Sequence, residues 1–98
     1  MVYVSAFTIQ GLELIFHSSD HPPPHFHVKG GDWEIRVFIE TSTAQVGLHY
    51  TYKFPKNFSK KFRGLSKHKE VELLLQVIKY RRELLYEWQE KVRSGEMI

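Results

Sequence analysis

The sequence predicts an α+β fold, in which a small antiparallel sheet of about four or five strands is followed by a long C-terminal helix. Two observations support this prediction. Residues 1–54 consist of short alternating, β-branched and aromatic stretches that glycine and proline turns separate. Residues 66–94 instead place apolar side chains at three- and four-residue steps, as a helix buried along one face does. With 98 residues, the chain is expected to form a single domain over residues 1–98.

Three strands and a proline loop are predicted outside the central hairpin. Residues 2–9 alternate between two sets of side chains, and Gly11 separates them from residues 12–17, so a tight turn is expected to join two strands. Residues 18–24 are expected to form a loop, because their consecutive prolines cannot donate hydrogen bonds to a sheet. Residues 46–54 alternate again and are predicted to form a further strand.

A β-hairpin is predicted around Gly30-Gly31, because both glycines accept the positive φ of a type I′ turn. With this turn, His27 is expected to face Glu34, and His25 to face Arg36, on the polar side of the hairpin. The opposite, apolar face is expected to pack against the helix through Phe26, Val28, Trp33, Ile35, Val37 and Ile39.

The predicted helix begins after Ser66, a favourable N-cap residue, and continues to about residue 94. Its apolar pattern is interrupted at Arg81-Arg82. A helix of about 27 residues would be roughly 40 Å long, which exceeds what a small sheet can cover. Its last turns are therefore expected to project or to pack on a partner. The side chains predicted to pack on the sheet are Val71, Leu74, Leu75 and Ile78.

The net charge of +3 is unevenly distributed. Residues 1–48 hold two basic and five acidic side chains, whereas residues 49–98 hold twelve basic and six acidic ones. Residues 53–69, which we call the basic segment, contain no acidic residue, so a negatively charged partner, RNA or DNA, is expected there. Phenylalanines between its cations are either rings on which bases stack or core anchors. The predicted nucleic-acid-binding residues of this segment are Lys53, Lys56, Lys60, Lys61, Arg63, Lys67 and Lys69.

The stretch HPPPHFHV places His21, His25 and His27 within seven residues. His25 and His27 lie two apart on a predicted strand, so their rings are expected to point to the same side. Three interpretations remain open. The histidines could make ordinary hydrogen bonds to the backbone and to Glu34, they could transfer protons or bind an anion, or they could bind a metal ion.

Proton transfer suits this residue set, because histidine titrates near neutral pH and two histidines beside a carboxylate and an arginine can divide the acid and base roles. Arg36 could hold a phosphate together with lysines of the basic segment. Of the reactions considered, metal-independent RNA cleavage requires the fewest groups from the protein, since the 2′-hydroxyl of RNA is itself the nucleophile. The candidate catalytic residues are His21, His25, His27, Glu34 and Arg36.

A metal site would combine His25 and His27 with Glu34 in a two-histidine, one-carboxylate set. Their order matches no specific metal motif, so weak or no metal binding and no cofactor are expected. The chain has no cysteine, and its first residues lack the order of a secretory signal. No apolar run approaches the roughly 18 residues of a membrane span, so a cytoplasmic location without membrane contact is expected.

The HPPPHFHV stretch, the glycine-turn hairpin and the ending YRRELLYEWQEKVRSGE together resemble a family of small bacterial proteins of unknown function whose hallmark is His-x-Pro-Pro-His-Phe-His. The resemblance covers about residues 11–96. Two departures are Tyr80, where the family pattern suggests histidine, and residues 45–65, which are longer and more basic. The positions that match the pattern are His21, Pro23, His25, Phe26, His27, Arg81, Leu84, Leu85 and Trp88.

The resemblance implies a short protein with strands in its N-terminal part and helix in its C-terminal part, from a family that is suspected of belonging to toxin–antitoxin-like gene pairs. We therefore expect a nucleic-acid-interacting protein of toxin–antitoxin type; whether it is an enzyme is left open, with metal-independent ribonuclease activity as the candidate reaction. RNA or DNA and a small antitoxin-like protein are its expected partners. Two alternatives remain open: a non-catalytic module that docks a protein through its C-terminal helix, and a histidine metal-binding protein.

Overall fold

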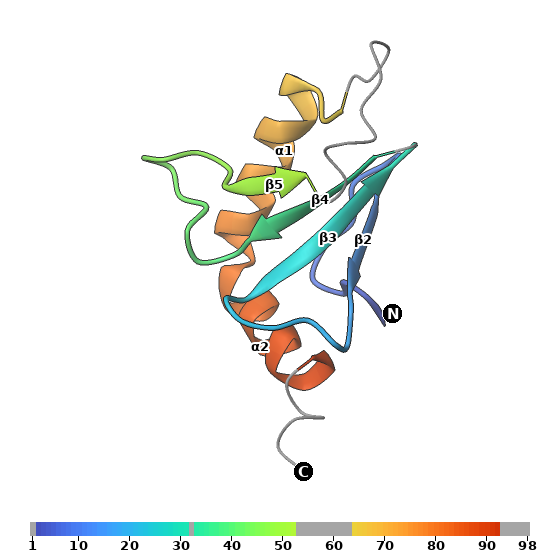
Figure 1. The fold of residues 1–98 in the computed structure, drawn as a ribbon. Helices are drawn as coiled ribbons and strands as arrows, with labels where there is room; N and C mark the ends of the chain where they lie inside the picture. Colours follow the sequence, from blue (N-terminus) through green and yellow to red (C-terminus); the bar gives the residue numbers. More distant parts are fainter. Residues whose placement is uncertain (1, 32, 53–63, 93–98) are drawn as a thin grey trace.

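The computed structural model describes residues 2–31, 33–52 and 64–92 and has the predicted α+β architecture (Figure 1). Five antiparallel strands form one sheet in the order β1-β2-β3-β4-β5, so each strand pairs with its neighbour along the chain. Two helices follow and lie against one face of this sheet. The strands are β1 (Val2–Tyr3), β2 (Glu13–Phe16), β3 (His25–Gly30), β4 (Trp33–Phe38) and β5 (Tyr50–Tyr52).

Two helices, α1 (Lys67–Lys79) and α2 (Arg81–Lys91), replace the single long helix expected from the sequence. The predicted N-cap is confirmed, because the Ser66 hydroxyl oxygen accepts a hydrogen bond from the Lys69 N–H at 3.2 Å. The break falls at Tyr80, whose φ of −108° and ψ of 22° lie outside the helical region. The last turns of the helical segment, which were expected to project or to pack on a partner, pack on the core instead, because Trp88 and Val92 are 1% and 2% exposed.

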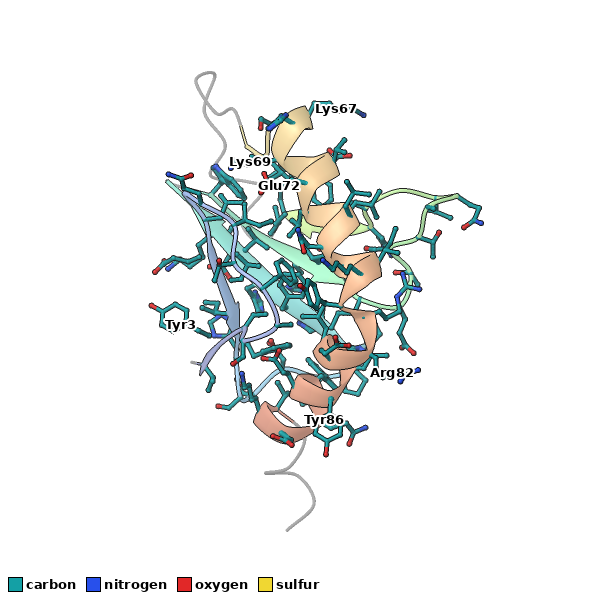
Figure 2. The ribbon with its side chains drawn as sticks, turned by 180° about the vertical axis from the view of Figure 1, so that it is seen from behind. Tyr3, Lys67, Lys69, Glu72, Arg82 and Tyr86 are labelled. Carbon is teal, nitrogen blue, oxygen red and sulfur yellow. The ribbon has the colours of Figure 1, made fainter. Side chains whose placement is uncertain are left out.

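The hydrophobic core lies between the sheet and the helices, which Figure 2 shows from the helical side. Three of the four residues predicted to pack on the sheet were wrong, because Val71, Leu75 and Ile78 are 46%, 61% and 37% exposed, while the fourth, Leu74, is half-buried. The first helix carries two apolar rows, and periodicity alone does not tell which one faces the sheet. The buried helical residues are Leu73, Val77, Leu84 and Trp88, which meet Leu14, Phe16, Phe26, Val28, Ile35 and Val37 of the sheet.

The hairpin between β3 and β4 has a different register from the predicted one. His27 lies opposite Arg36, and Gly30 pairs with Trp33 inside the sheet, so the turn begins at Gly31, whose φ is +39°. A Cβ atom on Gly30 would lie 2.5 Å from the Trp33 ring, which explains why glycine occupies this strand position. Because the register differs by two residues, each side chain still lies on its predicted face.

Polar contacts join α2 to the N-terminal residues and so fix the helix beside the start of β3. The Glu87 carboxylate accepts hydrogen bonds from the backbone N–H groups of Ser5 and Ala6 at 2.7 and 2.8 Å. The Lys91 amino group donates to the Tyr3 carbonyl oxygen at 2.9 Å and to the same Glu87 carboxylate at 2.6 Å. Neither helix of the described chain has the length and hydropathy that crossing a bilayer requires.

Candidate functional site: a buried histidine cluster beside an open pocket

Five ionisable side chains meet on the side of β3 that faces away from the hydrophobic core. We call them the histidine cluster, which consists of His17, Asp20, His25, His27 and Glu34. Strand β3 supplies His25 and His27, whose ring centroids lie 5.2 Å apart, as their two-residue spacing predicts. Glu34 comes from β4, whereas His17 and Asp20 come from the segment after β2, which folds back onto the sheet.

Asp20 connects the two strand histidines. Its Oδ2 atom lies 2.8 Å from Nε2 of His27 and 3.3 Å from Nε2 of His25. The other ring nitrogen of His25, Nδ1, lies 2.8 Å from the Pro23 carbonyl oxygen. A carbonyl oxygen only accepts, so Nδ1 of His25 carries a proton, and this hydrogen bond fixes the direction in which its Nε2 points. Asp20 and the proline loop therefore orient His25.

Glu34 occupies the opposite side of His27. Its Oε2 atom lies 3.0 Å from Nδ1 of His27 and 3.7 Å from Nε2 of His17. The rings of His17 and His27 meet edge to face, with centroids 4.1 Å apart. Each nitrogen of His27 thus faces a different carboxylate.

Burial separates the roles of these histidines. His27 is 1% exposed, and its burial lowers the pKa below the ordinary value of 6.5, although the hydrogen bond to Asp20 acts in the other direction. His27 is therefore neutral at neutral pH and has a single N–H to donate. A side chain so deeply buried does not reach a large substrate, so His27 is not expected to contact one.

An open pocket of about 400 Å³ lies beside the cluster. It brings together three of the predicted catalytic residues, His21, His25 and Arg36. His21 and Arg36 are exposed, whereas His25 is 6% exposed and lies at the pocket wall. We call this the anion pocket, after the anion binding that the sequence predicts for these histidines; its lining residues are Ser19, Asp20, His21, Pro22, Pro23, His25, Arg36 and Phe38.

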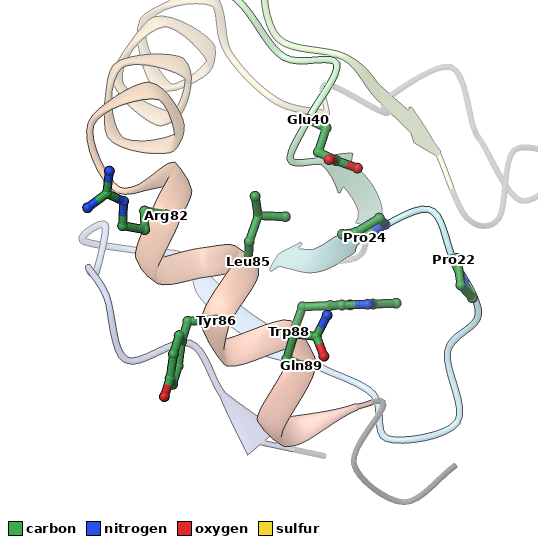
Figure 3. A pocket seen from close by; sticks show the side chains of 8 residues that line it. All are labelled: Pro22, Pro24, Glu40, Arg82, Leu85, Tyr86, Trp88 and Gln89. Atoms are coloured by element: carbon green, nitrogen blue, oxygen red, sulfur yellow. The ribbon is translucent and has the colours of Figure 1, made fainter. Parts of the chain in front are cut away.

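A second pocket of about 650 Å³ lies between the proline loop and α2 (Figure 3). Pro22 lines both pockets, and the ring centroid of Trp88 lies 5.3 Å from that of His25. We call it the tryptophan pocket; its lining residues are Pro22, Pro24, Glu40, Arg82, Leu85, Tyr86, Trp88 and Gln89.

Two of the seven predicted nucleic-acid-binding cations lie in the described chain (Figure 2). Lys67 is exposed at the start of α1. Lys69 is engaged with the protein itself, because its amino group donates to the Gln10 carbonyl oxygen at 3.0 Å and lies 3.5 Å from a Glu72 carboxylate oxygen. The predicted cations Lys53, Lys56, Lys60, Lys61 and Arg63 lie outside the described residues.

His17 and Asp20 belong to the cluster but not to the residues that the sequence predicts for the site. Both side chains can bind protons or metals, and both lie within ten positions of His27, which is the available signal. Sequence reasoning missed them because the path of the loop between β2 and β3 decides whether they reach His27, and that path has no periodicity.

The fold and this cluster together define an α+β domain with a buried histidine–carboxylate group at an open pocket. Residues 11–89 match the family described as Domain of unknown function (DUF4160), and the chain belongs to this family. The expected membership of a family of unknown function is therefore confirmed. No curated protein and no solved structure matches the chain.

The lowered pKa of His27 predicts a pH-dependent stability. Below about pH 6.5 the unfolded chain binds a proton at this position that the folded chain resists, so the free energy of unfolding is expected to fall as the pH decreases. The loss is at most about 1.4 kcal/mol per pH unit. Urea unfolding of chelator-treated protein at pH 7.5 and 5.5 measures it. A His27→Gln variant should lose less than wild type between these two values, and equal losses would contradict the prediction.

The matched control for this measurement is His68→Gln. His68 is exposed on α1, so its removal should leave the pH dependence of wild-type unfolding unchanged.

Proposed function

We propose that this protein interacts with nucleic acid, is of toxin–antitoxin type, and cleaves RNA without a metal ion at the reacting phosphate. The observation that most supports the proposal is the anion pocket, in which His21, His25 and Arg36 share one open cavity. Two imidazoles can exchange protons with a substrate, and a guanidinium matches the geometry of a phosphate. The toxin–antitoxin part of the proposal rests on the family resemblance.

The proposed reaction uses the RNA as its own nucleophile. One imidazole, from His21 or His25, removes the proton of the 2′-hydroxyl, and the 2′-oxygen then bonds to the adjacent phosphorus. The bond to the 5′-oxygen breaks, and the other imidazole gives this leaving oxygen a proton. Arg36 balances the charge that develops on the phosphate oxygens. The products are a 2′,3′-cyclic phosphate and a free 5′-hydroxyl.

The tryptophan pocket offers a place for a base next to the bound phosphate. Tyr86 is 67% exposed and presents its ring surface, Arg82 adds a cation at the same pocket, and Trp88, which is 1% exposed, forms part of the wall. Single-stranded nucleic acid is commonly held by this combination of aromatic stacking and positive charge. Because Pro22 lines both pockets, a nucleotide can place its phosphate in one and its base in the other.

Affinity for RNA is expected to depend on the basic segment and on salt. Each phosphate contact contributes roughly 0.7–0.9 to the slope of log affinity against log salt concentration. The double change Lys60→Ala with Lys61→Ala should therefore weaken binding to all sequences and lower the slope by about 1.4–1.8. Filter binding with single-stranded RNA and with DNA, at several salt concentrations, measures both quantities.

The matched control for this experiment is Lys29→Ala with Lys79→Ala. Both lysines are exposed and lie outside the basic segment, so the charge change is the same but the slope should stay as in wild type. If the wild-type protein shows no measurable affinity for RNA or DNA even at low salt, the proposed nucleic-acid binding is wrong.

Docking of a small partner protein, without catalysis, is the second candidate function. The observation that favours it is the exposed apolar row of Val71, Leu75 and Ile78 on α1. These residues are four and three positions apart, so they lie along one side of the helix. This candidate predicts that the lysine changes do not affect binding of a small antitoxin-like protein encoded beside this gene, while Leu75→Glu abolishes its capture in a pull-down; if no such gene exists, or if Leu75→Glu captures its product normally, the candidate is excluded.

A further inference from the structure

Three polar atoms of the histidine cluster converge on the side away from Asp20. They are Nε2 of His17, Nδ1 of His27 and Oε2 of Glu34, and all lie within 4.8 Å of one another. The carboxylate oxygen is 3.0 Å from the His27 nitrogen and 3.7 Å from the His17 nitrogen. Within the described residues, neither of these two nitrogens has a hydrogen-bond partner, and both are buried.

Hydrogen bonding within the protein leaves the His27 nitrogen without a proton. A neutral imidazole has one N–H, and in His27 only Nε2 has a hydrogen-bond partner, Asp20 at 2.8 Å, so we assign the N–H to Nε2. Its Nδ1 atom therefore carries a lone pair and faces a carboxylate oxygen 3.0 Å away. Two acceptors at this separation in a buried place repel each other unless a positive charge lies between them.

We propose that Nε2 of His17, Nδ1 of His27 and Oε2 of Glu34 bind one divalent transition-metal ion, with Zn²⁺ as the best match. Zinc bonds to histidine nitrogen and carboxylate oxygen are about 2.0–2.2 Å long, which separates tetrahedral ligand atoms by about 3.3–3.6 Å. The observed separations of 3.0 and 3.7 Å bracket this range. A water molecule would complete the four-coordinate shell.

The position of Asp20 favours a metal ion at His17, His27 and Glu34 over one at Asp20, His25 and His27. Metal-bound histidines usually donate their second ring N–H to a carboxylate, which fixes the ring and raises its basicity. The hydrogen bond from Nε2 of His27 to Asp20 has this form. On the other side, where Asp20, His25 and His27 meet, the same hydrogen bond already uses the His27 nitrogen.

The ion would join three successive parts of the sheet, because His17 follows β2, His27 is in β3 and Glu34 is in β4. Through the hydrogen bond to Asp20 it would also hold the carboxylate that faces His25. The ion lies behind the anion pocket and touches no substrate. The inference therefore does not depend on the proposed ribonuclease function, and binding of Zn²⁺ can be measured without any activity assay.

Zn²⁺ alone is the probe for this site. Chelator-treated wild-type protein should take up one Zn²⁺ per chain in equilibrium dialysis and in calorimetric titration. A free Zn²⁺ concentration a hundredfold above the dissociation constant should raise the melting temperature by about 10 °C or more, because only the folded chain has the assembled site. Failure to bind Zn²⁺ at 10 μM free metal, an order-of-magnitude threshold for a three-ligand site, would overturn the proposal.

Variants on the two sides of His27 locate the ion. His17→Ala should weaken Zn²⁺ binding by about 100-fold or more, whereas His25→Ala should leave it within about threefold of wild type. His17→Gln, which keeps a polar side chain of similar reach, repeats the test if the alanine variant folds poorly by circular dichroism. His68→Ala is the surface control, since His68 is exposed on α1. Loss of binding in His25→Ala, or full binding in both His17 variants, would overturn the assignment.

Discussion

Replacing Trp88 with alanine should lower the free energy of unfolding by about 3–5 kcal/mol, the range typical of truncating a large buried aromatic side chain. Trp88 is 1% exposed, and its ring centroid lies 6.5 Å from that of Phe16 and 5.3 Å from that of His25. The indole therefore joins α2 to the sheet and to the wall of the anion pocket. A domain of this size has a total free energy of unfolding of roughly 5–15 kcal/mol, so the substitution should remove a large fraction of it.

Urea unfolding followed by far-ultraviolet circular dichroism measures this loss. Tyr86→Ala is the matched control, since it removes an aromatic ring from the same helix at a position that is 67% exposed. It should change the free energy of unfolding by about 0.5 kcal/mol or less. If Trp88→Ala lost less than about 1 kcal/mol, α2 would not be packed on the sheet as described.

Much of the sheet could be predicted from the sequence because strands leave two strong local signals. Alternation along residues 33–38 places Ile35 and Val37 on one face, and the glycines next to them mark a turn. The β3–β4 register was predicted wrongly because a Gly-Gly pair allows more than one position for the turn. The contact between Gly30 and the Trp33 ring, which selects among these positions, appears only in three dimensions.

For the C-terminal part, the sequence predicted helical structure but not which side of the helix faces the sheet. The N-cap at Ser66 is a local signal and is confirmed. The local sequence does not determine which side of α1 packs on the sheet, because Leu73 and Val77 form one apolar row and Val71 and Leu75 form another. Which row is buried depends on how the bend at Tyr80 lets the second helix meet the sheet.

The residues of the candidate site also include some that the sequence could place and some that it could not. His25 and His27 could be placed on one side of a strand because strand periodicity fixes them. His17 and Asp20 reach His27 through a loop, and loop paths follow from tertiary contacts. Burial also had to come from the structure, since it separates His27, which is 1% exposed, from the accessible His21.

Replacing His25 with alanine should reduce RNA cleavage by about 100- to 10,000-fold, the usual contribution of one group in general acid–base catalysis. His25 lines the anion pocket, and its hydrogen bond to the Pro23 carbonyl oxygen holds the ring in one orientation. RNA affinity should change little, because the basic segment is proposed to supply most of the binding free energy through phosphate contacts. The effect therefore belongs to the rate of the chemical step and not to binding.

Single-turnover cleavage of a labelled RNA, without added divalent ions, tests this prediction. His49→Ala removes an exposed histidine that lines neither pocket and lies outside the basic segment, and it should cleave at the wild-type rate. A substrate with one 2′-deoxy position should resist cleavage at that position, because the attacking 2′-oxygen is missing there. Undiminished cleavage by His25→Ala, or cleavage of the 2′-deoxy position at the normal rate, would exclude a mechanism in which this pocket activates the 2′-hydroxyl.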